Sequence, residues 1–191
     1  MSRPAFSLAV LCLVVASMAS QAVGDIYQWT TGGVQSSTLC PGGAGVSAAP
    51  NAVLDNLDLT RAYLTRANLS NASMVSTTLN NALMYTATLT NANLGNANLS
   101  NAYLHGATLT NANLAGAMVT GADLSALTGF TAQQLYSTAS YQGVNLSGIV
   151  LDDNDLTSWD FTGQNLSNAS LSFAGLTNAS LSSFCGGRYV L

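Results

Sequence analysis

Residues 67–71 read ANLSN, residues 97–101 read ANLSN again, and the stretch Ala52–Ala126 is built from units of this kind. A large apolar residue stands at the centre of each of fifteen consecutive pentapeptides, from Leu54 to Leu124. The centre is Leu in twelve units, and the position two residues before it is Ala in thirteen. A fixed period over so many units predicts a solenoid, because one unit is too small to bury its own apolar face.

A period of five fits neither a helix nor a flat strand. On an α-helix, a step of five residues turns about 140° around the axis, so the central residues would scatter over all sides. On a strand, an odd period would send successive centres to opposite faces. The chain must therefore bend once per unit, with the centre and the Ala two residues before it pointing to an axis. The other three positions, mostly Asn, Thr, Ser, Gly and Asp, then face water.

The units that begin at Ala67, Ala97 and Ala122 resemble the consensus of the pentapeptide-repeat family, which is a small residue, Asn or Asp, Leu and two variable polar residues. The resemblance implies an all-β fold, a right-handed quadrilateral parallel β-helix with four pentapeptides per coil. Residues twenty apart tend to match, which agrees with four units per coil. The stretch DIYQW at 25–29 also resembles the start of the exported bacterial members of this family.

Residues 1–24 are predicted to be a secretory signal peptide. Arg3 precedes an apolar run over residues 5–15, which is too short to span a bilayer and is followed by small residues. Cleavage after Ala22 or before Asp25 would export the protein to the periplasm or the extracellular space, with no transmembrane anchor in the mature form. A retained membrane anchor is the alternative interpretation.

The mature chain is acidic and poor in charge. It has three arginines and eight aspartates, a net charge of −5, and neither Lys nor Glu. Nucleic-acid binding is not expected, because neutralising phosphates requires a basic footprint. Cys40 and Cys185 flank about six coils stacked at roughly 4.8 Å, so no disulfide between them is expected. Free thiols, or a bridge to another chain, remain open.

Residues 25–51 do not repeat and are expected to cap the first coil, with Ile26 and Trp29 covering the open end of the solenoid. A separate recognition element built on the aromatic residues is the alternative. The solenoid 52–126 is followed by an interruption at 127–143.

In this interruption, Thr131 and Gln134 have the spacing of a capping box. One short α-helix from about residue 132 to 139 is predicted against the side of the solenoid. A lid over a site is a second interpretation of the same segment.

The period resumes in a second repeat block, 144–183, whose early units are degenerate. Their inward positions are expected to be Val144, Ile149, Asn154, Trp159 and Gln164, and such large or polar residues predict a distorted or partly open coil. No capping helix is evident in the tail, 184–191. A homodimer through an uncapped C-terminal coil is therefore one expectation, and a shortened chain is the other.

The sequence contains no evident catalytic set, so no enzyme activity, catalytic residue, cofactor or metal is predicted. The single histidine, His105, follows a repeat centre and should point to solvent. The acidic cluster of Asp152, Asp153, Asp155 and Asp160 lacks the glycine and glutamate of an EF-hand loop. We expect a solvated turn there rather than a cation site.

One group of surface residues is a candidate binding patch. A period of twenty puts Tyr63, Leu83 and Tyr103 in one file and Tyr85 and His105 in another, with Arg66 nearby. Stacked tyrosines beside polar groups suit sugar rings or a protein partner. The alternative is that the tyrosines only stabilise adjacent strands.

The composition and the repeats favour an exported, noncatalytic scaffold that presents a polar surface for protein or glycan binding. Two alternative functions have less support from the sequence. A DNA-mimic, topoisomerase-binding role is known for some pentapeptide-repeat proteins, but it requires many acidic side chains stacked from coil to coil and a location in the cytoplasm. A β-helix carbohydrate-active enzyme would carry clustered acid, base and metal-ligating residues, which the sequence does not show.

Overall fold

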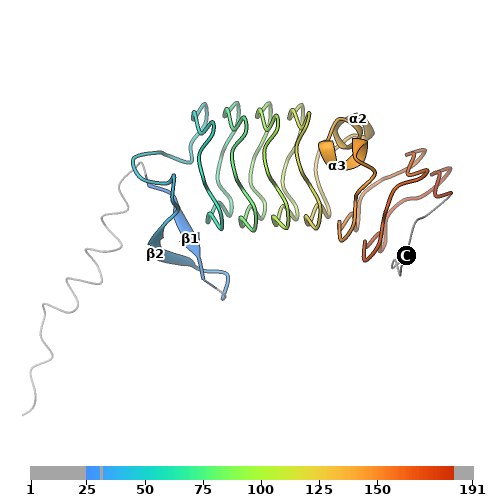
Figure 1. Ribbon diagram of the computed structural model, residues 1–191, viewed down its shortest axis with the longest axis horizontal. Helices are drawn as coiled ribbons and strands as arrows, with labels where there is room; N and C mark the ends of the chain where they lie inside the picture. Colours follow the sequence, from blue (N-terminus) through green and yellow to red (C-terminus); the bar gives the residue numbers. More distant parts are fainter. Residues whose placement is uncertain (1–24, 31, 183–191) are drawn as a thin grey trace, which may run out of the picture.

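The computed structural model describes residues 25–30 and 32–182, so the predicted signal peptide and the tail 184–191 lie outside the described residues. The named elements are β1 (Tyr27–Trp29), β2 (Gln35–Leu39), α2 (Ala132–Tyr136) and α3 (Ala139–Gln142). Figure 1 shows the hairpin at one end of a row of stacked coils and the two helices further along it. Within the described part, no helix is long and apolar enough to cross a membrane.

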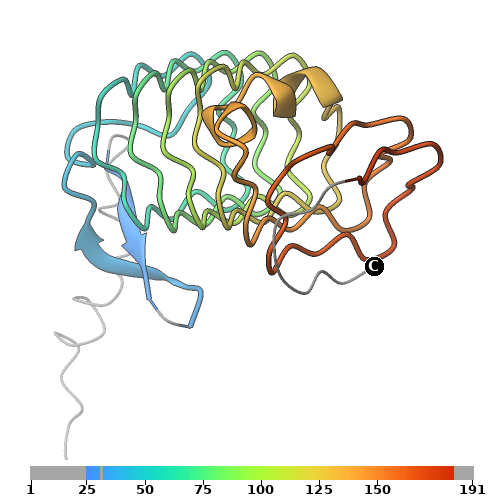
Figure 2. The same cartoon turned by 45° about the vertical axis from the view of Figure 1, so that its right-hand side comes forward.

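The coils are held together by parallel pairing of residues twenty apart, from Val53 with Ser73 to Thr108 with Thr128. This register is four pentapeptides per coil. On each side of a coil, one residue pairs with the next coil. Asn98, for example, pairs with Met118: Leu99 N donates to Met118 O over 2.8 Å, and Met118 N donates to Ala97 O over 2.9 Å. Figure 2 shows these coils as successive turns of one column.

The core is a column of repeat centres and small residues. Every centre from Leu54 to Leu124 is at most 2% exposed, which confirms the predicted inward orientation. Thr77, which stands where most units have Ala, is also fully buried, and its Oγ1 donates to Leu54 O over 2.7 Å. A polar side chain is accommodated here because its hydrogen bond is made within the column.

A left-handed backbone residue makes each bend of the coil. The residue before the small inward position has a positive φ in nearly every unit, as at Asn91 (58°), Asn96 (57°) and Asn101 (56°). Asn and Gly adopt this conformation most readily, which explains why they dominate this position. Stacked asparagines also bond between coils, because Asn91 Nδ2 donates to Asn71 Oδ1 over 3.1 Å.

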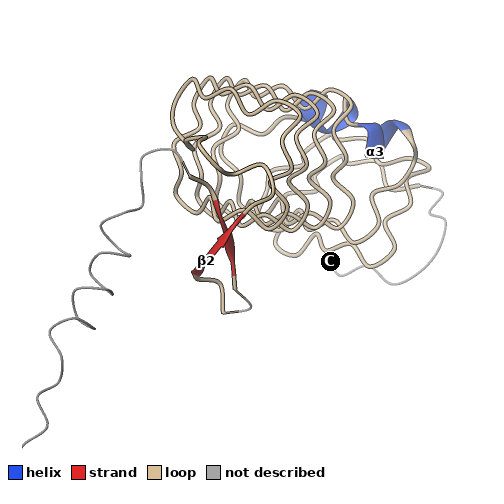
Figure 3. Cartoon of the chain, turned by 60° about the vertical axis from the view of Figure 1, so that its left-hand side comes forward, coloured by secondary structure: helices blue, strands red, loops and turns tan. Residues whose placement is uncertain are grey.

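At the first coil, β1 occupies the place that a preceding coil would take, but it runs antiparallel. Tyr63 N donates to Tyr27 O over 2.7 Å, and Trp29 N donates to Arg61 O over 2.9 Å. Figure 3 shows the hairpin projecting from this end of the column. Ile26 is buried against the core, with 2% exposed.

The expectation that Trp29 also covers the end is wrong. Its Nε1 donates to Asn81 O in the second coil over 2.6 Å, and its ring contacts that of Tyr103 in the third, with centroids 6.1 Å apart. Ile26 and Trp29 are three residues apart, and side chains at odd separations on an extended chain face opposite ways. When Ile26 enters the core, Trp29 therefore lies along the outside of the column.

The predicted short helix is confirmed at its start, residue 132, but it ends at Tyr136 and a second helix follows, so the expectation of one helix reaching residue 139 is wrong. The capping box of Thr131 and Gln134 is present at the start of α2, and Leu135 is fully buried. Thr138 separates the helices: its Oγ1 donates to Leu135 O over 2.7 Å and accepts from Tyr141 N over 3.1 Å. The same side chain thus closes α2 and caps α3.

The second block stacks on the first with a shift in register. Asp123 pairs with Val150, twenty-seven residues later, so the interruption adds seven residues to one coil before the spacing of twenty returns. Asn154 is buried, and its side-chain amide is hydrogen-bonded. Its Nδ2 donates to Leu124 O over 2.8 Å, and its Oδ1 accepts from Leu127 N over 3.1 Å. In Figure 1 the coils of this block are inclined to those of the first.

Aromatic side chains fill the junction of the two blocks. Trp159 is 8% exposed and packs against Phe130 and Phe161, with ring centroids 5.4 and 6.3 Å apart. Gln164 is also buried, and its Nε2 donates to Tyr141 O over 2.9 Å. Val144 does not take the predicted inward position, because it is 50% exposed and has a φ of 58° at the end of α3.

Candidate functional site

One side of the column carries the predicted patch. The centres Leu64, Met84, Leu104 and Leu124 point inward there, so the residues immediately before and after each centre point outward. We call this surface the Tyr–His face. Its residues are Tyr63, Leu83, Tyr103 and Asp123 in one file, Tyr85, His105 and Ser125 in the next, and Arg66 at the corner.

The structure brings most of the predicted patch together. Tyr63 pairs with Leu83, and Leu83 with Tyr103. The rings of Tyr85 and Tyr103 are 5.9 Å apart, and His105 is exposed. Leu83 is only 3% exposed, so its inclusion as a binding residue is corrected: it supports its neighbours rather than contacting a ligand.

His105 belongs to a hydrogen-bonded chain of three residues. Ser125 Oγ donates to Asp123 Oδ1 through a short hydrogen bond and lies 2.8 Å from Nδ1 of His105. A serine hydroxyl has one proton, so the Nδ1–H of His105 is the donor to Ser125. The order is Asp, Ser, His, whereas a hydrolytic triad places His between Ser and Asp. The arrangement orients the imidazole and does not activate the serine.

The hydroxyl of Tyr85 keeps its proton, so it acts as a hydrogen-bond donor. The pKa of Tyr85 is raised by burial first, and then by the nearby Asp123 and Tyr103. Arg61 lies over the ring of Trp29, with 4.8 Å from Cζ to the centroid, and its Nη2 donates to Trp29 O over 3.1 Å. Arg66 N donates to Tyr85 O over 2.8 Å, and the exposed guanidinium of Arg66 has no hydrogen bond or ion pair with another described residue.

The sequence prediction left out Asp123 and Ser125 of this face, and also Trp29, whose ring contacts that of Tyr103. The period of twenty that paired Tyr63 with Leu83 also leads from Tyr103 to Asp123 and from His105 to Ser125, so one further coil would have found two of them. Trp29 comes from outside the repeats, and no spacing in the sequence predicted where its ring lies.

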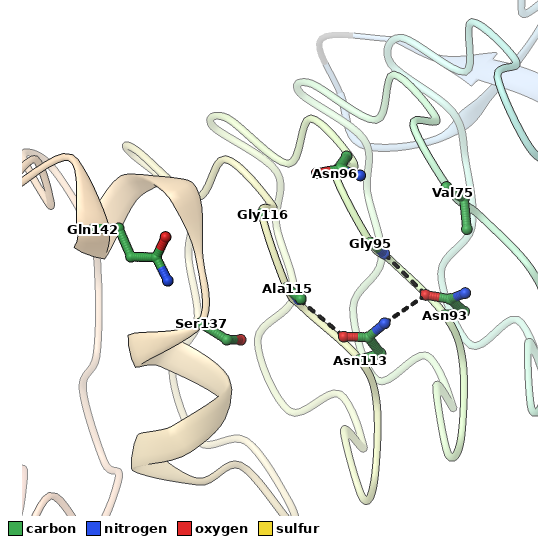
Figure 4. Close-up of a pocket in the computed structure, with 9 residues that line it drawn as sticks. All are labelled: Val75, Asn93, Gly95, Asn96, Asn113, Ala115, Gly116, Ser137 and Gln142. Atoms are coloured by element: carbon green, nitrogen blue, oxygen red, sulfur yellow. Dashed lines mark hydrogen bonds between the residues drawn. The ribbon is translucent and has the colours of Figure 1, made fainter.

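A hollow lies on the opposite side of the column, two pentapeptides away along each coil. It has a volume of about 480 Å³ and reaches the helical interruption (Figure 4). We call it the amide groove. Its lining residues are Val75, Asn93, Gly95, Asn96, Asn113, Ala115, Gly116, Ser137 and Gln142.

The aspartates of the predicted acidic cluster serve the turns of the solenoid. Asp155 and Asp160 accept hydrogen bonds from Thr157 N and Thr162 N over 3.0 and 2.8 Å. Hydrogen bonding by the side chains of these threonines, and then by their backbone N–H groups, lowers the pKa of both carboxyl groups. Asp152 Oδ1 accepts from Ser172 N in the next coil over 2.8 Å. Among the residues that the structure describes, no three His, Cys, Asp or Glu gather in a way that could hold a metal ion.

Cys40 is a free, buried cysteine whose Sγ donates to Thr60 O over 3.7 Å. Burial, and to a lesser extent Asp58, raises the pKa of its thiol to about 12. The thiol is therefore protonated and unreactive at neutral pH. Cys185 lies outside the described residues, so the absence of a disulfide between the two stays a prediction.

Comparison with known proteins identifies the family. The sequence model of the pentapeptide repeats matches eight copies in residues 51–84, 87–125 and 145–182, which together make up more than half of the chain. The chain therefore belongs to the pentapeptide-repeat family, as the sequence resemblance indicated. Proteins of this family fold as right-handed quadrilateral β-helices.

Solved structures of similar proteins include HetL from the cyanobacterium Nostoc sp. strain PCC 7120, a pentapeptide-repeat protein involved in the regulation of heterocyst differentiation. It has 28% identity over 71% of this chain and 70% of its own, with a TM-score of 0.34. Rfr23 from the cyanobacterium Cyanothece 51142 has 38% identity over 45% and 47%, with a TM-score of 0.27. A trypsin-treated variant of QnrB1, a plasmid-mediated fluoroquinolone resistance protein, has 18% identity over 64% and 63%, with a TM-score of 0.40. No curated protein matched the chain.

Proposed function

We propose that this chain is an exported, noncatalytic scaffold, a right-handed four-sided β-helix whose Tyr–His face binds a protein partner. The observation that carries the proposal is the exposed guanidinium of Arg66, which has no hydrogen bond or ion pair among the described residues, on a face with the partly exposed rings of Tyr63, Tyr85 and Tyr103. Tyrosine and arginine are the residue types most enriched in protein interfaces and in their energetic centres.

The chemistry of the face specifies the kind of partner. A tyrosine offers a large apolar ring and a hydroxyl while losing little conformational entropy on binding. Arg66 can form a bidentate pair with a carboxylate. We therefore expect a partner that presents a carboxylate next to an apolar or aromatic side chain. Export through residues 1–24 would place this partner outside the cytoplasm.

A photo-crosslinking residue placed at Tyr85 tests the proposal in the protein's own compartment. We expect a defined protein adduct that disappears when Arg66→Ala or Tyr103→Ala is added. The matched control puts the same crosslinker at Ser100, which follows a repeat centre on an adjacent side, and should give no such adduct. The same adducts from both positions would contradict the proposal. So would glycan binding that requires Tyr85 and Tyr103, because it would assign this face to sugars.

A topoisomerase-binding role has less support from the surface. The aspartates do not stack into acidic files, because Asp58 pairs with Thr78 and Asp123 pairs with Tyr103 and Val150. A supercoiling assay with the purified chain is expected to show no inhibition of topoisomerase.

A further inference from the structure

The geometry points to the amide groove as a second binding site, one that takes a neutral glycan lying along the column. This site is independent of the Tyr–His face and lies on the opposite side of the coils.

The hollow exists because side chains are missing at one repeat position. On the other three sides, the residue after each centre carries a polar or aromatic side chain in every coil of the first block. On the side of the groove, the residue after the centre is Val75, Gly95 and Ala115 in three successive coils. The bend of the chain at this corner is Gly116, again without a side chain. Ala115 and Gly116 therefore leave backbone accessible in one coil, as the floor of the groove, whereas Gly95 in the neighbouring coil is buried beside the amides of Asn93 and Asn113 (Figure 4).

Side-chain amides stand around this floor. Asn113 Nδ2 donates to Asn93 Oδ1 over 2.9 Å, and Asn93 Oδ1 also accepts from Gly95 N over 3.1 Å. Asn93 Nδ2 is thereby left to donate outward. The amides of Asn96 and Gln142 have no hydrogen-bond partner among the described residues. The groove thus offers free donors and free acceptors at several points along its length.

The helical interruption closes one end of the groove. Ser137, between the two helices, accepts from Gly116 N through its carbonyl over 2.8 Å, which fixes the end wall to the floor. Gln142 projects from α3 above it (Figure 4). The interruption therefore shapes the groove as well as joining the two repeat blocks.

These groups select a neutral, hydroxyl-rich ligand. No lining residue is charged or titratable, so an ionic ligand would lose hydration without gaining a counter-charge. The backbone of the floor is already paired: Ala115 N donates to Asn113 Oδ1 over 3.0 Å, and Ala115 O accepts from Asn96 N over 2.9 Å. A peptide cannot add as a strand to such a saturated ladder. Sugar hydroxyls donate and accept at once, as amides do.

An array of short neutral oligosaccharides, with acidic oligosaccharides and uncharged extended peptides as further probes, tests the site on the purified full chain. We expect retention of neutral glycans alone. Calorimetry on the glycan bound best should show about three- to tenfold weaker binding for Asn113→Ala and for Gln142→Ala, the loss of one or two hydrogen bonds. Ala115→Gln, which fills the groove, should abolish binding.

Ser100→Gln is the matched control, because it adds the same side chain after a repeat centre on an adjacent side. It should bind the glycan as the unaltered chain does, and so should Tyr85→Ala, which alters only the Tyr–His face. Equal binding by Ala115→Gln and Ser100→Gln, with both variants melting normally, would overturn the inference. No retained glycan, or retention of peptides or acidic glycans instead, would overturn it too. None of these results bears on the protein partner of the Tyr–His face.

Discussion

Single residues in this chain are constrained by the backbone as much as by burial. A pentapeptide needs an apolar centre, a small inward residue and a residue that tolerates positive φ. The first two requirements could be predicted from the sequence, because period and polarity reveal which side chains are buried. The third could not, since asparagine at Asn96 or Asn101 resembles any other water-facing amide until its backbone is seen.

At a repeat centre, burial dominates stability. Leu99 is fully buried in mid-column, so Leu99→Asp should disrupt several coils, because it places an unpaired charge among apolar side chains. Asn101→Ser, at an exposed bend, should cost less than about 1 kcal/mol. Thermal unfolding of the two variants measures the difference, and equal melting temperatures would contradict this account of the core.

At a bend, conformation dominates stability. Gly116 has a φ of 71°, whereas Gly95 has no positive φ. Gly116→Ala is expected to lower the free energy of unfolding by about 1 to 2 kcal/mol, the strain of a side chain in the left-handed region. Gly95→Ala should change it little. Urea unfolding of both variants checks the comparison, which fails if the two substitutions cost the same.

The buried thiol gives stability a dependence on pH. The pKa of Cys40 rises from 9.0 to about 12 on folding, so the folded state favours the protonated thiol. Its contribution to stability is complete below pH 9 and is lost as pH rises from there toward 12. In a chain whose other cysteines are replaced by Ser, we expect Cys40 to resist iodoacetamide at pH 8 until urea unfolds the protein. Rapid labelling of the native chain would contradict this.

At the scale of elements, the junction between the blocks is the part that the sequence described least well. The degenerate inward residues predicted a distortion, and the capping box predicted a helix. The second helix and the aromatic packing could not be predicted, because they depend on contacts between segments such as Phe130 and Trp159 that no local pattern records. The same applies to Trp29, whose position follows from the antiparallel pairing of β1 with the first coil.

Trp159 holds the second block to the interruption through the contacts of its ring with Phe130 and Tyr136. Trp159→Ala is expected to cost about 3 to 5 kcal/mol, as for other buried aromatic residues. It should also split unfolding into two transitions, with the second block melting first. Phe173→Ala is the control, because Phe173 is 91% exposed and should leave the melting curve unchanged. Differential scanning calorimetry separates these outcomes, and one unshifted transition for Trp159→Ala would refute the role of the junction.

At the scale of the whole molecule, the two ends of the column differ. The first coil is covered by β1, whereas Leu176 and Leu181 in the last described coil are only partly buried. The end of a column that its chain leaves uncovered favours self-association, and none of the described residues covers this one, so the chain is expected to sediment as a dimer. Leu181→Asp should give a monomer of unchanged fold. Sedimentation of the unaltered chain as a monomer at high concentration would rule out the dimer.

The spacing of twenty residues per coil has a consequence for how such a gene can change length. An in-frame duplication or loss of twenty codons within the first block would lengthen or shorten the column by one coil. Every outward side chain would still face the same direction. A gain or loss of five codons would instead rotate all the following pentapeptides by a quarter turn about the column axis. The two binding surfaces would then no longer continue from one coil to the next.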